Sequence, residues 1–246
     1  MERFLKTASA VLAVLLPAAA AAENGPMGYT YATYYVCDVA TQANMDNVVE
    51  INEKRVFDQW VAEEKMLDWG YLSHSTGGRW RRLHYHVAPT IDDVLRNQAA
   101  VFSSIYAGNA VGAQARAAAC ASHDDYIWSI DQGSAPGAGA GDVRRAAYFV
   151  CDINREARAD AIVRQIHAPL LDALVEDDRL SGWNWQSHVL GGEFRRLAVL
   201  EGGDHASVVQ ASLEMQQTLR REHPQLLSEF NAICGAHTDY LWDVVH

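Results

Sequence analysis

Residues that could bind and transform a small molecule are concentrated in the segment Trp80–Val87. Alternate side chains of a β-strand share a face, so Trp80, Arg82, His84 and His86 would lie together. We expect the intervening side chains to pack on helices and this polar row to line a cavity between two sheets. An arginine can hold an anionic or carbonyl group of a substrate, and a histidine, whose ordinary pKa is about 6.5, can move protons.

A hairpin predicted at Gly77-Gly78 decides which residues lie beside this row, because both glycines accept positive φ. A two-residue turn sets Tyr71 opposite His84 and adds an aromatic side chain to the wall. A three-residue turn shifts the register by one and adds His74 instead. Two glycines favour the shorter turn.

The pattern recurs farther along the chain. An offset of 114 residues aligns Cys37 with Cys151 and Arg82 with Arg196, and 25 of the 99 positions from 32 to 130 are identical in the two copies. So many identities are well above chance, and they indicate that the chain contains two copies of one unit.

The second copy keeps only part of the candidate site. Arg196 and His188 repeat two of the candidates, whereas Ala198 and Leu200 stand where the first copy has the strand histidines. A duplicated pocket that kept its polar chemistry on one side would show this asymmetry. The candidate acid/base residues are His84, His86, His74 and His188. The candidate substrate-binding residues are Arg82, Arg196, Tyr71, Trp80, Asp38 and Asp152.

The first strand of each copy, predicted at about 32–39 and 146–153, contains one aspartate near its end that could pair with an arginine. If the cysteine before it faces the helices, Asp38 faces the opposite side of the sheet with Tyr34, where it can pair with Arg82. The equivalent pair in the second copy is Asp152 with Arg196. These pairs could instead be buried salt bridges that specify the fold, with the histidines at a wet cavity mouth.

Each copy has the predicted order strand, helix, strand, strand, helices, strand, which indicates a four-stranded sheet with helices on one face. This βαββαβ order with an extra helix resembles the ferredoxin-like unit of the dimeric α/β-barrel superfamily, in its tandem form. The resemblance implies an α+β fold in which ferredoxin-like repeats at 30–130 and 144–246 pack as one barrel, joined by a Gly/Ala/Pro linker at 131–143. Members include heme proteins and cofactor-independent monooxygenases, so the resemblance implies no single chemistry.

Four cysteines occupy duplicated positions. Cys37 and Cys120 lie in the first copy, Cys151 and Cys234 in the second, and the two residues of each pair are 83 positions apart. In an exported chain this arrangement predicts disulfides Cys37–Cys120 and Cys151–Cys234. The alternatives are buried free thiols or a metal held by Cys120-x-x-His123 and its repeat. Each unit supplies only one such Cys/His pair, so we expect no metal there.

The N-terminal segment and the charge indicate where the protein works. Residues 1–22 have a charged start, a hydrophobic stretch too short to span a bilayer and an A-x-A cleavage signature, which predict a secretory signal peptide. We therefore expect a periplasmic or secreted protein with no membrane association after cleavage. The 31 acidic and 20 basic side chains leave a net charge of −11, which argues against nucleic acid and anionic lipid as partners.

These features predict an exported small-molecule-binding protein. A cavity between the repeats would accommodate an aromatic or carbonyl compound, on which a histidine would act without a cofactor. One alternative is a non-catalytic exported binding or structural module. Another is a barrel that binds heme or a divalent metal, the metal being held by the His84-x-His86 pair with His74. Assembly into a homo-oligomer is left open.

Overall fold

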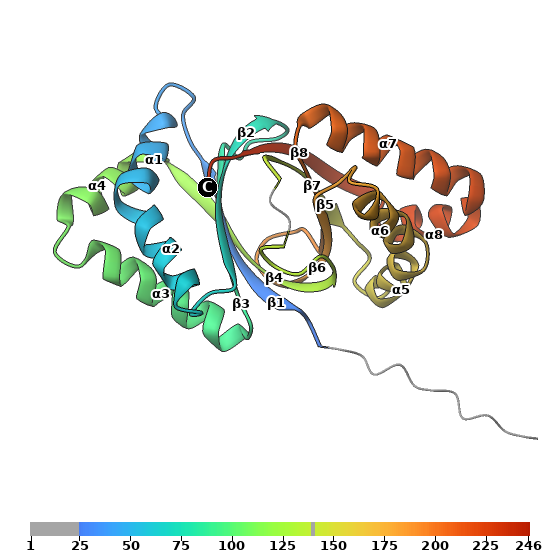
Figure 1. Cartoon of the computed structure of the whole chain (residues 1–246), viewed down its shortest axis with the longest axis horizontal. Helices are drawn as coiled ribbons and strands as arrows, with labels where there is room; N and C mark the ends of the chain where they lie inside the picture. The colour runs from blue at the N-terminus through green and yellow to red at the C-terminus, as the bar shows by residue number, and fades with distance from the viewer. Residues whose placement is uncertain (1–24, 139–140) are drawn as a thin grey trace, which may run out of the picture.

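Figure 1 shows a computed structural model that describes residues 25–138 and 141–246. The expected signal peptide at 1–22 lies outside the described residues. The strands are β1 (Gly28–Val36), β2 (Asp68–Thr76), β3 (Arg82–Ala88), β4 (Ser122–Gly133), β5 (Val143–Val150), β6 (Gly182–Leu190), β7 (Arg196–Gly202) and β8 (Ala236–Val244). β4 continues to Gly133, into the segment expected as a linker.

The helices fall into two sets, one for each repeat. Those of the first repeat are α1 (Ala43–Val48), η1 (Val49–Glu53), α2 (Lys54–Ala62), α3 (Ile91–Tyr106) and α4 (Ala110–Ala119). Those of the second are α5 (Glu156–Ile162), η2 (Val163–His167), α6 (Ala168–Glu176), α7 (His205–Glu222) and α8 (Pro224–Cys234). The short segments η1 and η2 are π-helical turns inside otherwise continuous α-helices.

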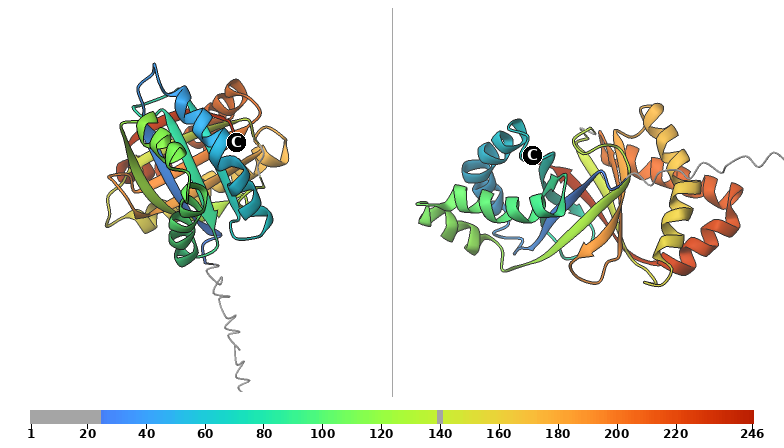
Figure 2. Two further views of the ribbon diagram at one scale, coloured as in Figure 1. Left: turned by 90° about the vertical axis from the view of Figure 1, so that its left-hand side faces the viewer. Right: turned by 90° about the horizontal axis from the view of Figure 1, so that it is seen from below.

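The eight strands form one closed antiparallel barrel in the order β1-β3-β2-β8-β5-β7-β6-β4. Each repeat contributes four adjacent strands, and the repeats join where β2 pairs with β8 and where β4 pairs with β6. The two sets of helices cover opposite sides of the barrel, as Figures 1 and 2 show. The predicted α+β fold with an intrachain barrel is confirmed.

Aromatic side chains fill the barrel interior. Tyr34 and Tyr148, which come from the first strand of each repeat, meet edge to face with ring centroids 5.4 Å apart. Trp80 stacks on Tyr240 of the other repeat, with centroids 5.2 Å apart. The interior is therefore a packed core shared by both repeats. The alternating side chains of β3 that face into it are Leu83, Tyr85 and Val87.

The glycine pair after β2 lets the other repeat approach closely. Gly77 has φ +138°, and a Cβ there would lie 2.6 Å from the carbonyl oxygen of Asp239 and 2.7 Å from the ring of Tyr240. Gly191 has the same φ and would meet Tyr126 of the first repeat in the same way. Each repeat thus places a tyrosine over the other repeat's hairpin.

Both predicted disulfides are present. Cys37–Cys120 and Cys151–Cys234 each tie the chain after the first strand of a repeat to the junction between its last helix and last strand. Each bond closes a long loop, which constrains the unfolded chain.

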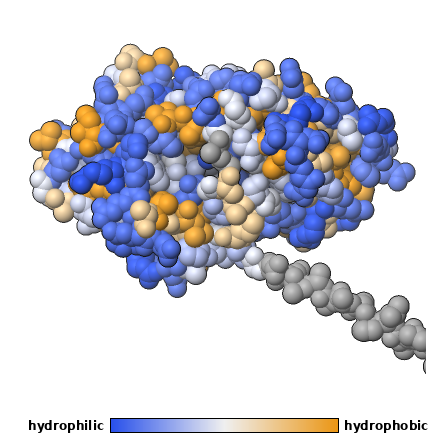
Figure 3. Space-filling model, viewed as in Figure 1, coloured by the Kyte–Doolittle hydropathy of each residue, from blue (hydrophilic) through white to orange (hydrophobic). Residues whose placement is uncertain are grey.

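The surface has small apolar groups and no membrane-spanning helix among the described residues. In the view of Figure 3 hydrophobic residues occur in small groups rather than in one large patch, so this face presents no broad apolar docking surface. None of the helices in the described ranges has the length and apolar character needed to cross a bilayer. Homo-oligomer formation stays a prediction.

Candidate functional site

The polar row of β3 faces the helices and not the barrel interior. Arg82, His84 and His86 are 5%, 3% and 0% exposed, and His84 lies against Phe57 of α2 with ring centroids 4.6 Å apart. The expectation that this row lines a cavity between two sheets is therefore wrong. The predicted register, which sets Tyr71 opposite His84, is confirmed.

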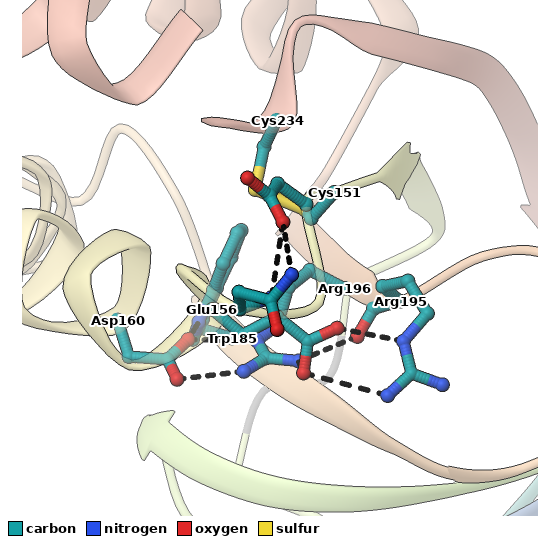
Figure 4. Close-up of a disulfide and its surroundings, with 9 residues drawn as sticks. Cys151, Glu156, Asp160, Trp185, Arg195, Arg196 and Cys234 are labelled. Atoms are coloured by element: carbon teal, nitrogen blue, oxygen red, sulfur yellow. Dashed lines mark hydrogen bonds and ion pairs between the residues drawn. A yellow bond between two sulfur atoms is a disulfide. The ribbon is translucent and has the colours of Figure 1, made fainter. Parts of the chain in front are cut away.

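Arg82 and Arg196 bind the first helix of each repeat to the sheet. Arg82 donates from Nε and Nη2 to the carboxylate of Asp46 on α1, at 2.5 and 2.7 Å. Arg196 donates in the same way to Asp160 on α5, at 2.7 Å for both bonds. Figure 4 shows this second pair near the disulfide, and Glu156 lies 3.1 Å from Nη1 of Arg196. Both guanidinium groups are thus paired within their own repeat.

The predicted pairs of these arginines with Asp38 and Asp152 are wrong. Both aspartates are exposed in the turns after β1 and β5, and each accepts a hydrogen bond from the backbone N–H two residues later. The strands end before these residues, so the alternation of strand faces does not extend to them. The arginine pairs are the buried salt bridges of the alternative interpretation, made with different carboxylates.

Of the other candidates, only Tyr71 lies beside the β3 row. It belongs to the helix-covered core of the first repeat, and its hydroxyl donates to Asp46, the partner of Arg82. Trp80 belongs to the barrel interior. His74 and His188 lie on the two seams between the repeats, each edge-on to the tryptophan of the neighbouring strand. Burial lowers the pKa of both. The structure does not bring the predicted residues into one cavity.

A buried polar cluster fills much of the space between sheet and helices in the first repeat. Glu53, at the end of η1, is fully buried and accepts hydrogen bonds from Arg116 and from the hydroxyl of Tyr106. Its second carboxylate oxygen lies 3.7 Å from Nε2 of His84. Arg116 also donates to the hydroxyl of Tyr35. A more open groove of about 430 Å³ remains on the outer side of the cluster.

The second repeat has a cavity of about 600 Å³ in the equivalent place. It lies between the outer face of the second-repeat strands and the helices η2, α6, α7 and α8. This volume falls in the range of roughly 300–1,000 Å³ that is common for small-molecule sites. Much of the wall is apolar or aromatic and includes Phe149, Leu171, Trp183, Trp185, Leu200 and Phe230.

Substitutions between the copies open this cavity. At the offset of 114 residues, the second repeat replaces Glu53 by His167, His84 by Ala198, Arg116 by Phe230 and Tyr106 by Arg220. The buried ion pair of the first repeat is thereby lost, and the strand side chain in its middle shrinks to a methyl group. The same fold therefore encloses a charged cluster in one repeat and an open space in the other.

His167 is the buried base of the cavity. It ends η2, is 7% exposed and lies beside Phe230 with ring centroids 5.0 Å apart. Its Nδ1 has no hydrogen-bond partner in the described residues. Burial lowers the pKa of His167 to about 4, although the nearby carbonyl of Ile162 raises it in part. The imidazole is therefore neutral at pH 7 and can accept a proton or donate an electron pair to a metal.

A second cavity, of about 70 Å³, lies at one end of the barrel interior. Tyr85 donates to Asp68 there at 3.0 Å, and Arg144 lies 3.5 Å from Glu201. Burial raises the pKa of both carboxyl groups. This space has room for a few water molecules only, so we assign no organic ligand to it.

Within residues 25–138 and 141–246, no three His, Cys, Asp or Glu side chains are placed to share a metal ion. The four cysteine sulfurs are all bound in disulfides.

Similarity to known proteins was found in structure and not in sequence. No protein-family model matches the chain, and no curated protein is significantly similar to it. An anthrone oxidase-like protein has a TM-score of 0.53 at 12% identity, over 89% of this chain and 92% of its own. A mutant chlorite dismutase from Candidatus Nitrospira defluvii has a TM-score of 0.54 at 11% identity, over 91% and 93%. A heme-binding protein from Thermus thermophilus has a TM-score of 0.50 at 12% identity, over 89% and 91%.

These similarities extend over nearly the whole of each chain and concern the fold. Together with the closed barrel of eight strands, they show that this protein has the dimeric α/β-barrel fold, with both halves of the barrel in one polypeptide.

Proposed function

We propose that the second-repeat cavity binds a small, largely apolar molecule. The observation that carries this proposal is the difference between the repeats, because the space that Glu53, His84 and Arg116 fill in the first is open in the second. We further propose that the protein works outside the cytoplasm. The two disulfides support this location, since such bonds persist in oxidising compartments.

In this proposal His167 takes the acid/base role that the sequence suggested for the strand histidines. His84 and His86 are packed against aromatic side chains, whereas His167 lines the cavity. A neutral imidazole beside a bound aromatic or carbonyl compound can accept a hydrogen bond from it, and it takes the proton if ligand binding raises the lowered pKa of His167. No cofactor is needed for that step.

The first test measures binding of N-phenyl-1-naphthylamine, a neutral aromatic probe whose fluorescence rises in apolar sites. The variant Ala198→Phe places a ring in the cavity, so we expect it to weaken binding at least tenfold. The control Ala99→Phe makes the same change at an exposed position of α3. Equal binding by the wild type and both variants would show that the probe lies elsewhere, and the proposal would be abandoned.

Heme is a second candidate ligand, favoured by the unpartnered ring nitrogen of His167 in an aromatic cavity. The structurally similar protein from Thermus thermophilus is described as heme-binding. In this chain His167 would hold the iron, and Trp185 and Phe230 would contact the macrocycle. A bound heme would supply electron-transfer or oxygen chemistry.

Hemin titration separates the two candidates. If heme is the ligand, the wild type develops a sharp Soret band at one equivalent, and His167→Ala shifts and weakens that band. His123→Ala, at an exposed histidine of the first repeat, should leave the spectrum unchanged. A Soret band that is the same in wild type and His167→Ala would exclude His167 as the iron ligand.

A further inference from the structure

The ionisable side chains that line the second-repeat cavity are those of two arginines, Arg145 and Arg220, and two histidines, His167 and His237. No carboxylate of the described residues lines the wall. The whole chain has the opposite balance, with 31 acidic against 20 basic side chains. A wall with arginines and no carboxylate favours an anionic ligand over an uncharged one.

Arg220 is the cation of this wall that has no acidic partner. Arg145 donates to Asp239 at 2.7 Å, so this carboxylate offsets the charge of Arg145, and His237 lies 2.9 Å from the same carboxylate. Arg220 makes no such contact with any carboxylate of residues 25–138 and 141–246 within 4 Å. The next residue, Arg221, pairs with Glu222 at 2.8 Å.

The position of Arg220 on α7 gives the cavity one polar edge. Ser212, Gln216 and Arg220 are spaced by four residues, so they form a row on one side of the helix, and all three line the cavity. The sheet presents Trp185 and Leu200 to the same space. The strands also place Arg145, Asn184 and His237 on the wall, so α7 is one of two polar parts of the cavity. A ligand that matches this arrangement has a flat apolar body against the aromatic side chains and carries a polar group toward α7.

The equivalent residue of the first repeat supports a role in binding. Tyr106 stands where the second repeat has Arg220, and its hydroxyl donates to Glu53 at 2.5 Å as part of the buried cluster. The second repeat has neither that glutamate nor the tyrosine. The arginine therefore belongs to the repeat in which the cavity is open.

We propose that the ligand of this cavity is a flat apolar molecule that carries an anionic group, such as a carboxylate or sulfonate, and that Arg220 binds this group. This inference rests on the proposed binding function and defines the class of ligand. The guanidinium would form charge-assisted hydrogen bonds to the anion at the cavity mouth, while the aromatic wall covers the apolar body.

Two probes that share one aromatic skeleton test the inference. 8-Anilinonaphthalene-1-sulfonate carries a sulfonate, and N-phenyl-1-naphthylamine is the same skeleton without it. We expect Arg220→Gln to weaken binding of the sulfonate probe about tenfold, as for the loss of one charged hydrogen bond, and that of the neutral probe less than twofold. Arg221→Gln removes an adjacent arginine that is paired outside the cavity, so it should change neither affinity.

The outcomes separate this inference from the proposed function. If Arg220→Gln leaves the sulfonate affinity unchanged while Ala198→Phe still abolishes binding of the neutral probe, the cavity binds apolar molecules and the anion assignment is wrong. If Arg220→Gln and Arg221→Gln lower the affinity for the sulfonate probe equally, the loss comes from the general charge of the surface, and the assignment is also wrong. If Ala198→Phe affects neither probe, the proposed function itself fails.

Discussion

Buried histidines distinguish the two repeats at the scale of single residues. His84 and His86 are enclosed by aromatic side chains of the first repeat, and His167 lines the open cavity of the second. Burial lowers the pKa of each below the ordinary value. All three are neutral at pH 7, but only His167 is placed to meet a ligand.

The burial of His86 predicts how stability depends on acid. Its pKa is about 4 in the folded protein and about 6.5 in an unfolded chain, so between these values the unfolded state binds more protons. The free energy of unfolding must therefore fall as the pH is lowered from 6.5 to 4, with a share of about 3 kcal/mol from this residue.

The variant His86→Leu removes this share and installs the residue that the second repeat has at the equivalent position, Leu200. The free energy of unfolding, measured by chemical denaturation at several pH values, should fall between pH 6.5 and pH 4 by about 3 kcal/mol less in the variant than in the wild type. Parallel curves for the two proteins would contradict the assigned pKa of His86.

His167 could not be predicted from the sequence as a site residue, because it has no identical counterpart in the first repeat. The identities between the repeats, such as Arg82 with Arg196, include residues of structural ion pairs. The site that we propose lies instead where the copies differ, at His167 and Arg220. Replacement of Glu53 by His167 inside an apolar helix face was the available signal, but only the structure shows that a cavity accompanies it.

At the scale of elements, the strands and their pairing could be predicted, whereas the faces of β3 could not. Alternation places His84 and His86 on one face and Leu83 and Tyr85 on the other, as observed. It does not tell which face meets the helices when both are buried, and here the more apolar row fills the barrel. The polar side chains of this row contact carboxylates on the helices, such as Asp46 for Arg82 and Glu53 for His84, and the alternation within the strand carries no information about these partners.

The hairpin glycines determine how closely the repeats can join. Gly77→Ala should lower the free energy of unfolding by about 2 kcal/mol or more, because φ of +138° strains any other residue and a Cβ would press on backbone and ring atoms of β8. Gly203→Ala is the control, since nothing lies within 4 Å of a Cβ at that position. Equal denaturation midpoints for both variants would refute the role given to this contact.

At the scale of the whole molecule, duplication gave two similar repeats with different interiors. They contribute to one barrel core. Each repeat also has its own disulfide, its own buried arginine–aspartate pair and its own π-helical turn. In the first repeat internal charges fill the inner part of the helix layer and leave an outer groove, whereas in the second repeat the inner space is open. We therefore propose that the first repeat is a scaffold and that the second binds the ligand.

This assignment is tested most directly by a crystal structure of the protein grown with 1-bromonaphthalene, whose bromine can be located by anomalous scattering. We expect a bromine peak in the second-repeat cavity, beside Trp185 and Phe230, and none in the helix layer of the first repeat. A peak in the first-repeat groove beside Arg116, with the second-repeat cavity empty, would contradict this assignment.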